Sequence, residues 1–492
     1  MSQHVAIVGS GFLGMTLALR LAEAGAKVTM FESSDRIGGL AAAWEIGGFE
    51  WDKHYHVTLA SDSYTRKIVE EIGLGDEFKW VETKTGFYTD GKLHSMSDTM
   101  EFLKFPPLGL IDRLRLAATI LYASRQTDWR SLEKIPVADW LVKLAGKRTF
   151  EKIWRPLLGA KLGDSYERTS AAFIWATIQR MFAARRSGLK KEMFGYVRGG
   201  YARVLRQFSE TLMAKGVEIH LNSEIDRIEK LPNGSLRVLP RRSRRRTDEK
   251  KVVLRRGEMV VEAPKYARVH TSAPVSPGFS GMFLSEPGLR AGIEVSPDAA
   301  LAMREYDQVI LTCPSRKAAE MLPQLPEHEA AKLRNIEYQG IVCASVLMKC
   351  SLSPFYVTNI TDDAPFTGVI EMTALVDKRE FGQNTLVYLP KYVSPDDELF
   401  EKTDAEIRES FFAGLERMYP HFKRNDVIAF RVSRVRNVFP LPVLNYSDSL
   451  PSVRTSIENV FVVNSSQIVN GTLNVNETVQ LAEKFFENEL QK

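Results

Sequence analysis

The feature that most constrains the fold is the glycine-rich segment GSGFLG at positions 9–14. A short apolar run, VAIV at 5–8, precedes it, and residues 12–24 follow with apolar side chains spaced by three and four, as in an amphipathic helix. Gly25 then ends the predicted helix, and KVTMFE at 27–32 supplies a second strand. A strand, a helix and a strand at this short spacing form a βαβ unit with parallel strands. We therefore expect an α/β protein with a doubly wound, Rossmann-like parallel sheet.

The three glycines of this G-x-G-x-x-G pattern have different mechanical roles. Gly9 permits a tight turn, Gly11 lets a phosphate approach the backbone, and Gly14 lets the helix pack closely on the strand. A pyrophosphate would then meet the positive end of the helix, which begins with Phe12 and Leu13. The pattern in this context predicts a dinucleotide site.

The identity of the dinucleotide is narrowed by an acidic residue. Glu32 ends the second strand, 18 residues after Gly14 and directly before Ser33. A carboxylate at this place can accept hydrogen bonds from the hydroxyl groups of a ribose, and it disfavours a 2′-phosphate. We therefore expect a ligand other than NADP.

Glu32 also opens the segment ESSDRIGGL, which has the pattern E-x-x-x-R-x-G-G. This segment resembles the second fingerprint of flavoproteins of the amine oxidase, phytoene desaturase and protoporphyrinogen oxidase superfamily. The resemblance implies that the cofactor is FAD. It further implies that Arg36 contacts the pyrophosphate and that Gly38, Gly39 and Leu40 pass close to the cofactor.

Two later segments extend the resemblance. The stretch GYVRGGYARVLRQFSETLMAKGVEIHLNSEIDRIE is similar to a family segment in which the residue matching Ile225 holds the adenine through its backbone. Near the end of the chain the family has a strand followed by Gly-Asp, whereas here NVFVVN places Asn464 in the approximate position of that aspartate. The closing helix begins near Val475, with Asn474 or Asn476 as its N-cap, and its positive end would favour negative charge near the flavin.

Two motifs absent from the sequence indicate the electron donor of the flavin and the way the flavin is attached. No second glycine-rich βα turn occurs later in the sequence, so we expect electrons to come from the substrate rather than from NAD(P)H. The C-terminal segment contains no cysteine, so we expect FAD to be bound non-covalently. The resemblance implies an oxidoreductase that oxidises a C–N or C–C bond of a small or amphipathic substrate by hydride transfer to flavin N5.

The segment DKHYHVT at 52–58 holds two of the eight histidines. In a strand, alternation would place His54 and His56 on one face and Tyr55 on the other. Metal ligation is the weakest interpretation, because no carboxylate and histidine cluster accompanies them, and we predict no metal site. A catalytic and a purely structural role stay open, with His54, Tyr55 and His56 as the catalytic candidates.

The same segment supports an alternative reaction. HYHVT is similar, with a shifted register, to an H-I-F-H-T segment of the UDP-galactopyranose mutases, in which reduced flavin forms an adduct with a sugar without net redox change. A flavin-binding protein without turnover is a further alternative.

At 492 residues the chain exceeds one ordinary hydrophobic core, so a second domain inserted into the first is expected. We predict a discontinuous FAD-binding domain at 1–60, 195–320 and 455–492, a helical cap of the substrate domain at 61–194, and a β-rich part of the substrate domain at 321–454. Within the cap, IWRPLLGAKLG offers Arg155 and Lys161. Either these cations hold an anionic or amphipathic substrate, or they lie along a packed helix pair.

Charge and composition bear on partners. The net charge of +5 depends on one insert, because residues 241–256 carry nine Lys/Arg and two Asp/Glu; we therefore expect a small-molecule substrate and no nucleic acid, and the sequence leaves the oligomeric state open. The three cysteines form neither a disulfide framework nor a zinc pattern, and apolar sequence begins at Val5, which together favour a cytoplasmic protein. The stretch FLKFPPLGLIDRLRLAATILYA at 102–123 suggests a peripheral membrane contact, although burial in the cap is the favoured interpretation.

Overall fold

The computed structural model describes residues 3–186, 193–241, 251–255, 258–262, 301 and 303–491. The predicted βαβ unit is confirmed: β1 is His4–Val8, α1 is Phe12–Glu23 and β2 is Lys27–Phe31. β1 pairs in parallel with β2 along its whole length. Most of the basic insert at 241–256 lies outside the described residues.

The first sheet has seven strands in the order β14-β13-β10-β2-β1-β16-β22. Its further members are β10 (Glu218–Leu221), β13 (Lys251–Arg255), β14 (Glu258–Glu262), β16 (Gln308–Leu311) and β22 (Val460–Val462). Pairing is parallel from β10 across β2, β1 and β16 to β22, and antiparallel at β13 and β14. The fold is thus α/β with a parallel sheet, and its strands come from the start, the middle and the end of the sequence.

Both faces of this sheet are covered, because successive side chains of β1 enter different cores. Val5 and Ile7 pack with α1, α10 (Gly200–Ala214) and α15 (Val475–Phe485). Ala6 and Val8 pack on the other face with the elements β11 (Ile225–Lys230), β12 (Leu236–Pro240), β15 (Glu305–Tyr306), α12 (Ser315–Met321) and α13 (Glu327–Arg334). Burial on both sides explains why VAIV is a continuous apolar run rather than an alternating one.

The second sheet also has seven strands, in the order β21-β17-β20-β19-β18-β7-β8. They are β21 (Val427–Pro440), β17 (Tyr338–Met348), β20 (Thr385–Val393), β19 (Gly368–Glu371), β18 (Val357–Ile360), β7 (Thr85–Thr89) and β8 (Lys92–Ser95). Helix α14 (Asp404–Met418) packs on one of its faces. Because β7 and β8 come from the segment 61–194, that segment is not purely helical; the division into domains stays a prediction.

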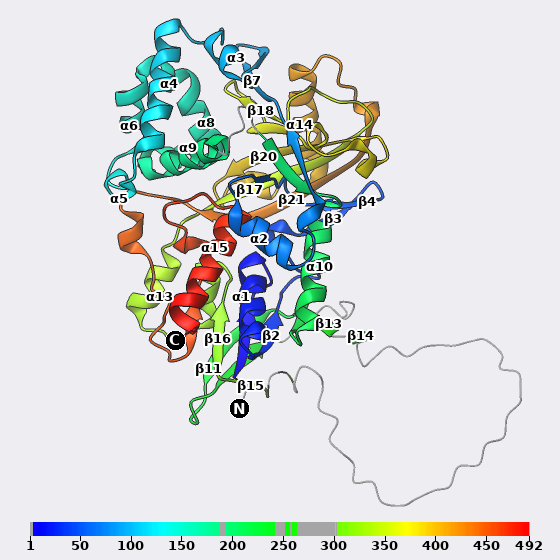
Figure 1. Cartoon of the computed structure of the whole chain (residues 1–492), viewed down its shortest axis with the longest axis vertical. Helices are drawn as coiled ribbons and strands as arrows, with labels where there is room; N and C mark the ends of the chain where they lie inside the picture. The colour runs from blue at the N-terminus through cyan, green and yellow to red at the C-terminus, as the bar shows by residue number, and fades with distance from the viewer. Residues whose placement is uncertain are drawn as a thin grey trace, which may run out of the picture.

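A layer of helices lies at the end of the molecule away from the N-terminus (Figure 1). It contains α3 (Thr99–Leu103), α4 (Leu110–Arg125), α5 (Trp129–Leu132), α6 (Val137–Ala145), α7 (Lys147–Thr149), α8 (Arg155–Leu162) and α9 (Ala171–Arg186). These helices share an aromatic and aliphatic core of their own. Smaller elements include the helix α2 (Ser63–Glu71), a two-stranded sheet of β3 (Ala43–Ile46) and β4 (Phe49–Asp52), and a three-stranded sheet in the order β5 (Thr58–Leu59), β9 (Met193–Val197) and β6 (Phe78–Glu82).

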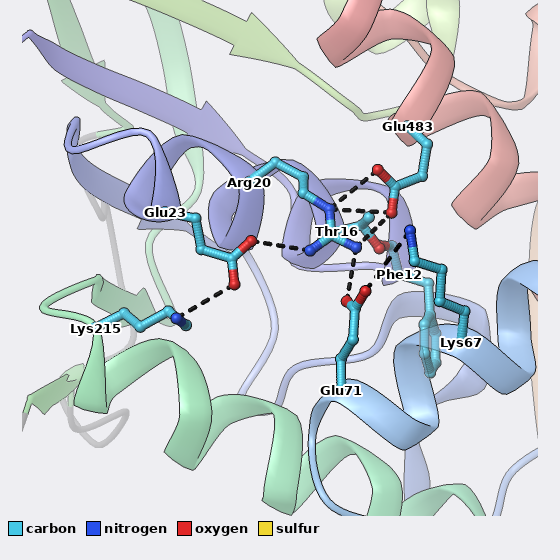
Figure 2. Close-up of polar contacts among 8 residues, drawn as sticks. All are labelled: Phe12, Thr16, Arg20, Glu23, Lys67, Glu71, Lys215 and Glu483. Atoms are coloured by element: carbon cyan, nitrogen blue, oxygen red, sulfur yellow. Dashed lines mark hydrogen bonds and ion pairs between the residues drawn. The ribbon is translucent and has the colours of Figure 1, made fainter. Parts of the chain in front are cut away.

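Arg20 of α1 joins three helices in a network of ion pairs (Figure 2). Its guanidinium donates to Glu483 of α15 and to Glu71 of α2, each at 2.6 Å, and to Glu23 at 2.9 Å. Lys215, directly after α10, reaches Glu23 at 3.2 Å. Because the side chains of Arg20 and Glu483 are only 12% and 11% exposed, this pair is screened less than a surface pair and holds α15 against α1.

Candidate active site

The turn between β1 and α1 has the geometry that the glycine pattern requires. Gly9 has φ +112°, and a Cβ on Gly14 would lie 2.1 Å from the carbonyl oxygen of Gly9. A Cβ on Gly11 would meet no atom of the described residues within 4 Å, its own chain neighbours aside. Gly11 is also the N-cap of α1 and supplies no side-chain cap, while Phe12 and Leu13 bury their side chains in the core. The backbone amides at this helix end therefore border open space, which is the arrangement that binds a phosphate.

Glu32 lies at the end of β2 and is almost buried, with 9% of its surface exposed. One carboxylate oxygen accepts from the backbone N–H (3.0 Å) and hydroxyl (2.7 Å) of Ser10. The other accepts from the N–H and hydroxyl of Ser34, both at 2.9 Å, and more weakly from the Ser33 hydroxyl at 3.4 Å. A carboxylate already bound by hydroxyl groups suits a ribose diol, because O–H donors of a ligand can replace those of serine.

The loop after β2 returns to the phosphate turn. Gly38 forms an isolated parallel bridge with Gly11, and both Gly38 (φ +106°) and Gly39 (φ +57°) lie in the left-handed region. A Cβ on Gly38 would approach the side chain of Leu205 to 2.4 Å. Arg36 donates to the carbonyl of Ala43 at 2.8 Å and has 41% of its side chain exposed, so its charge lies at the edge of this loop.

Ile225 begins β11 with a fully buried side chain and lies opposite Pro240. Pro240 has no N–H group, so it cannot donate to the backbone of Ile225. Asn464 follows β22 and is buried: its amide donates to the Cys313 carbonyl at 2.9 Å, and its carbonyl oxygen accepts from the N–H of Ser466 at 2.9 Å. Both side-chain ends of Asn464 therefore hold the protein's own loops together.

The N-terminus of α15 has Asn474 as its cap. Its side-chain oxygen accepts from the N–H of Glu477 at 3.0 Å, and Val475 is the first helical residue. Asn476, the other cap candidate, accepts instead from the N–H groups of Tyr64 (2.9 Å) and Thr65 (3.2 Å) at the start of α2. Thus α2 and α15 begin beside each other.

The expectation of a strand at DKHYHVT is wrong. Residues 53–57 form a loop between β4 and β5, and none of the strands that the structure describes pairs with them. His54 is buried and bridges two distant parts of the chain: its Nδ1 lies 3.1 Å from the Leu40 carbonyl oxygen, and its Nε2 lies 3.1 Å from the Ser433 hydroxyl. A carbonyl only accepts, so Nδ1 donates and Nε2 accepts from Ser433. Burial lowers the pKa of His54 to about 4, which keeps the ring neutral.

His56 has different neighbours. Its ring centroid lies 5.1 Å from that of Tyr201, and its Nδ1 lies 3.8 Å from a carboxyl oxygen of Asp52. The other Asp52 oxygen accepts from the N–H of Tyr201 at 2.8 Å, at the start of α10. Burial lowers the pKa of His56 to about 3 and raises that of Asp52 to about 8. Burial therefore favours the uncharged form of both groups at neutral pH, in an enclosed recess that His56, Asp52 and Tyr201 line together with Thr58.

Tyr55 points toward the second sheet, where its hydroxyl shares a hydrogen bond of 2.9 Å with that of Tyr392 on β20. Lys161 of α8 lies on the same aromatic ring, with Nζ 3.6 Å from the Tyr392 centroid and 5.0 Å from that of Phe439. Burial lowers the pKa of Lys161 to about 7, and Lys161 forms no ion pair with any residue that the structure describes. The structure thus brings Tyr55 and Lys161 together at one ring.

Arg155 does not join this group. Its side chain is 57% exposed and pairs with Glu151 one turn earlier, at 2.8 Å. Sequence reasoning did not predict the polar and aromatic neighbours of Lys161 and of the loop at 53–57, which we call the histidine loop; these neighbours are Asp52, Tyr201, Tyr392, Ser433 and Phe439. Two of them carry a signal in the sequence: Asp52 belongs to the segment DKHYHVT itself, and the alternation in TLVYLPKY indicates that Tyr392 lies on one face of a sheet. The other three lie 145 residues or more from the histidines in sequence, so no local pattern indicates them.

Other kinds of site find no support in the described part of the chain. No group of three or more His, Cys, Asp or Glu side chains there is placed to hold a metal ion. None of the helices described is long and apolar enough to cross a bilayer. Cys313, Cys343 and Cys350 are free thiols.

Comparison of the sequence with known proteins identifies a family and several distant relatives. A family model described as flavin containing amine oxidoreductase matches residues 14–254 and 290–474. The 15-cis-phytoene desaturase of Glycine max is 24% identical over 253 residues, which cover 48% of this chain and 44% of the desaturase. The chain thus spans about half the length of the curated relatives it matches.

Several solved structures superpose on nearly the whole of this chain. A protein from Exiguobacterium sp. 255-15, provisionally assigned as a protoporphyrinogen oxidase, superposes with a TM-score of 0.69 at 16% identity, over 99% of this chain and 98% of that one. Reduced UDP-galactopyranose mutase superposes with a TM-score of 0.66 at 14% identity, over 99% and 94%. At these identities the likeness shows a shared fold.

Proposed function

The chain belongs to the family of flavin-containing amine oxidoreductases, and we propose that it is an FAD-dependent oxidoreductase that oxidises a C–N or C–C bond of a small or amphipathic molecule. The observation that carries the proposal is the group formed by Tyr55, Tyr392 and Lys161. Tyr55 lies in the loop at 53–57, which His54 holds against the Leu40 carbonyl, and Leu40 directly follows the Gly38–Gly39 pair beside the phosphate turn. We infer that the phosphate turn and this aromatic group belong to one site.

The residues fit FAD, the cofactor of this family. The amides of Phe12 and Leu13 beside Gly11 would hold the pyrophosphate, Glu32 the ribose and the backbone of Ile225 the adenine. When bound, FAD supplies the two-electron acceptor, which takes a hydride at N5. The N-terminus of α15, capped by Asn474, would favour negative charge on the ring.

Lys161 is suited to handle a proton on the substrate. With its pKa lowered to about 7, it exists near neutral pH as a mixture of amine and ammonium. The neutral Lys161 amine can accept a proton from a substrate ammonium group, and the substrate must lose this proton before it can give up a hydride. The charged Lys161 ammonium can hold a substrate carboxylate. Tyr392 and Phe439 form apolar walls around it that exclude water. Of the two cations predicted to bind substrate, the proposal retains Lys161.

His54 and His56 take different parts in the proposal. His54 fixes the path of the loop through its two hydrogen bonds, to Leu40 and Ser433. His56 has an Nδ1 without a hydrogen-bond partner among the described residues, and Asp52 lies within 3.8 Å of it. This separation is too long for a hydrogen bond in the structure as it stands; we propose that a closer approach on substrate binding lets a protonated Asp52 donate to Nδ1, which leaves the opposite ring nitrogen as a donor toward the site.

Bleaching of the flavin tests the reaction. The purified protein is mixed anaerobically with amines, polyenes, porphyrinogens and nucleotide sugars, and the flavin absorbance is followed. Bleaching by an amine or a polyene supports the proposal. Turnover that needs prior reduction by dithionite and gives no net redox change would favour the mutase-like alternative, and the absence of any response would favour flavin binding without turnover.

Two variants of α8 sharpen this test. Lys161→Met should slow substrate-driven flavin reduction, because it keeps the length of the side chain and removes the amine. Arg155→Met, on the same helix, should leave the rate unchanged, because Arg155 is exposed and paired with Glu151. Equal rates in both variants would contradict the assignment of Lys161.

We also propose that FAD is bound non-covalently. Cys313 lies next to the phosphate turn, but burial raises the pKa of its thiol to about 12, so it stays protonated and is a poor nucleophile. Acid precipitation should leave the yellow chromophore in the supernatant, whereas a coloured pellet would contradict the proposal.

A further inference from the structure

Helix α4 exposes an apolar face. Leu110, Ile111, Leu114, Leu121 and Tyr122 have 61%, 72%, 54%, 42% and 49% of their surfaces exposed, and we call these five residues the α4 patch. The opposite face of α4, with Leu116, Thr119 and Ala123, is buried against the helical layer. A surface helix normally turns charged and polar side chains outward, so α4 is apolar on the face where polar residues are expected.

The patch continues onto neighbouring helices. Met100 and Leu103 of α3 and Val142 of α6 are 59%, 38% and 37% exposed. Together with the α4 patch they make up eight of the eleven large apolar side chains that are exposed in the described part of the chain. Exposed apolar residues scattered singly need no explanation, but a concentration on one end of the molecule marks an interaction surface.

Cations surround the apolar side chains. Arg115 and Arg125 lie on the exposed face of α4 itself, and Lys104 and Lys143 are exposed beside it. None of these four forms an ion pair with a residue that the structure describes. Of the acidic residues on α4 and α6, Asp112 is paired with Arg148 and Asp139 is exposed. The segment 99–149 carries nine Lys/Arg and five Asp/Glu, a net charge of +4.

The exposed apolar side chains and the cations around them together indicate what binds the α4 patch. A two-fold dimer would place the same patch of each copy against the other, and Arg115 and Arg125 of both copies would then repel. An anionic lipid surface satisfies both features at once, because its headgroups attract the cations and its acyl boundary takes up the apolar side chains. We propose that the α4 patch docks this protein on the surface of an anionic lipid bilayer.

The position of the patch suits this mode of binding. Figure 1 shows α4 within the helical layer, at the end of the molecule away from the N-terminus. At sixteen residues α4 is too short to span a bilayer but long enough to lie in its interface. The docking does not depend on the proposed reaction, so a failure of one leaves the other standing.

Vesicle flotation of the FAD-loaded full chain tests the proposal. The vesicles contain phosphatidylcholine alone or phosphatidylcholine with phosphatidylserine, at low and high salt. The protein should float with the anionic vesicles, less so at high salt, and only weakly with the neutral ones. The double substitution Ile111→Glu with Leu114→Glu should weaken binding at least about ten-fold, because charges cannot enter the acyl boundary.

Ile428→Glu is the matched control, because Ile428 is 44% exposed on β21 and lies outside the patch. It should bind as the parent protein does, and an unchanged flavin spectrum in each variant excludes unfolding. Absence of flotation of the parent protein would overturn the proposal, as would equal binding by the double variant. Sedimentation of a dimer that the double variant converts to a monomer, without vesicle binding, would also overturn it and identify the patch as an interface between copies.

Discussion

Replacing Gly11 and Gly14 separately with alanine tests the phosphate turn, because the two glycines face different surroundings. The new methyl group at Gly14 would lie 2.1 Å from the carbonyl oxygen of Gly9, a backbone atom that cannot rotate away. At Gly11 it would lie more than 4 Å from every atom of the described residues, apart from Gly11 itself and its neighbours in the chain. One substitution therefore disturbs the protein itself, and the other disturbs only what the protein binds.

The magnitudes follow from these distances. Overpacking costs about 1–3 kcal/mol. The exchange of glycine for alanine inside a helix returns about 1 kcal/mol. With the clash at the upper end of its range, Gly14→Ala should lower the free energy of unfolding of the apoprotein by about 1–2 kcal/mol. Gly11 has φ −68° and ψ 172°, which alanine adopts freely, so Gly11→Ala should change that free energy by less than about 0.5 kcal/mol.

For the affinity for FAD, the direct effect is expected from Gly11→Ala instead. The methyl group at position 11 occupies the space that a phosphate needs, and overpacking of about 1–3 kcal/mol against the ligand corresponds to a Kd raised about 5- to 150-fold. Apoproteins would be unfolded in denaturant, and FAD would be titrated into them with its fluorescence as the signal. Equal FAD affinity of Gly11→Ala and the parent chain would contradict the phosphate site at Gly11. Equal stability of the Gly14→Ala and parent apoproteins would contradict the close packing at Gly14.

Five further changes test the site and the packing of the helices around it. Substrate-driven flavin reduction should rise with pH through an inflection near pH 7, the lowered pKa of Lys161, and a pH–rate profile of Lys161→Met should lack that inflection. His54→Ala should cost about 1–3 kcal/mol of stability in denaturant titrations, because Leu40 and Ser433 lose a buried partner; His56→Ala should keep the flavin spectrum but slow anaerobic reduction, and an unchanged rate would refute its role. The raised pKa of Asp52 makes the folded state bind the extra proton between about pH 4 and pH 8, so the parent chain should lose stability relative to Asp52→Asn as pH rises through this range; parallel curves would contradict the assignment. Arg20→Met should lower the free energy of unfolding by about 1–3 kcal/mol, since it leaves the partly buried Glu483 unpaired, and added salt should shrink the difference between the two chains.

The parts that the sequence predicts well are those in which cause and effect lie close together in the chain. The strand, turn and helix around Gly9 and Gly14 depend on residues within one βαβ unit, and the structure has them where the pattern indicates. The cap of α15 is local in the same way, and Asn474 occupies it. Each of these elements follows from backbone geometry and hydrogen bonds over a few residues.

The histidine loop shows what a local pattern misses. Alternation suggests one face for His54 and His56, but a strand forms only where a neighbour pairs with it. The partners that decide the conformation of His54 are Leu40 and Ser433, 14 and 379 residues away. Likewise Arg155 and Lys161 look equivalent in sequence, and only the packing of α8 on β20 turns one outward and the other onto Tyr392.

The ion pair between Arg20 and Glu483 joins a helix formed by residues 12–23 to one formed by residues 475–485. Likewise β16 has β1 on one side and β22 on the other, so the central sheet is complete only when residue 462 is present. During synthesis on the ribosome the phosphate turn is made more than 450 residues before α15, one of the helices that pack against α1. Contacts of such long sequence separation form slowly. We therefore expect the nascent chain to expose the apolar side of α1 through most of translation, and the C-terminal segment to act as the closing step that commits the chain to its cofactor-binding state.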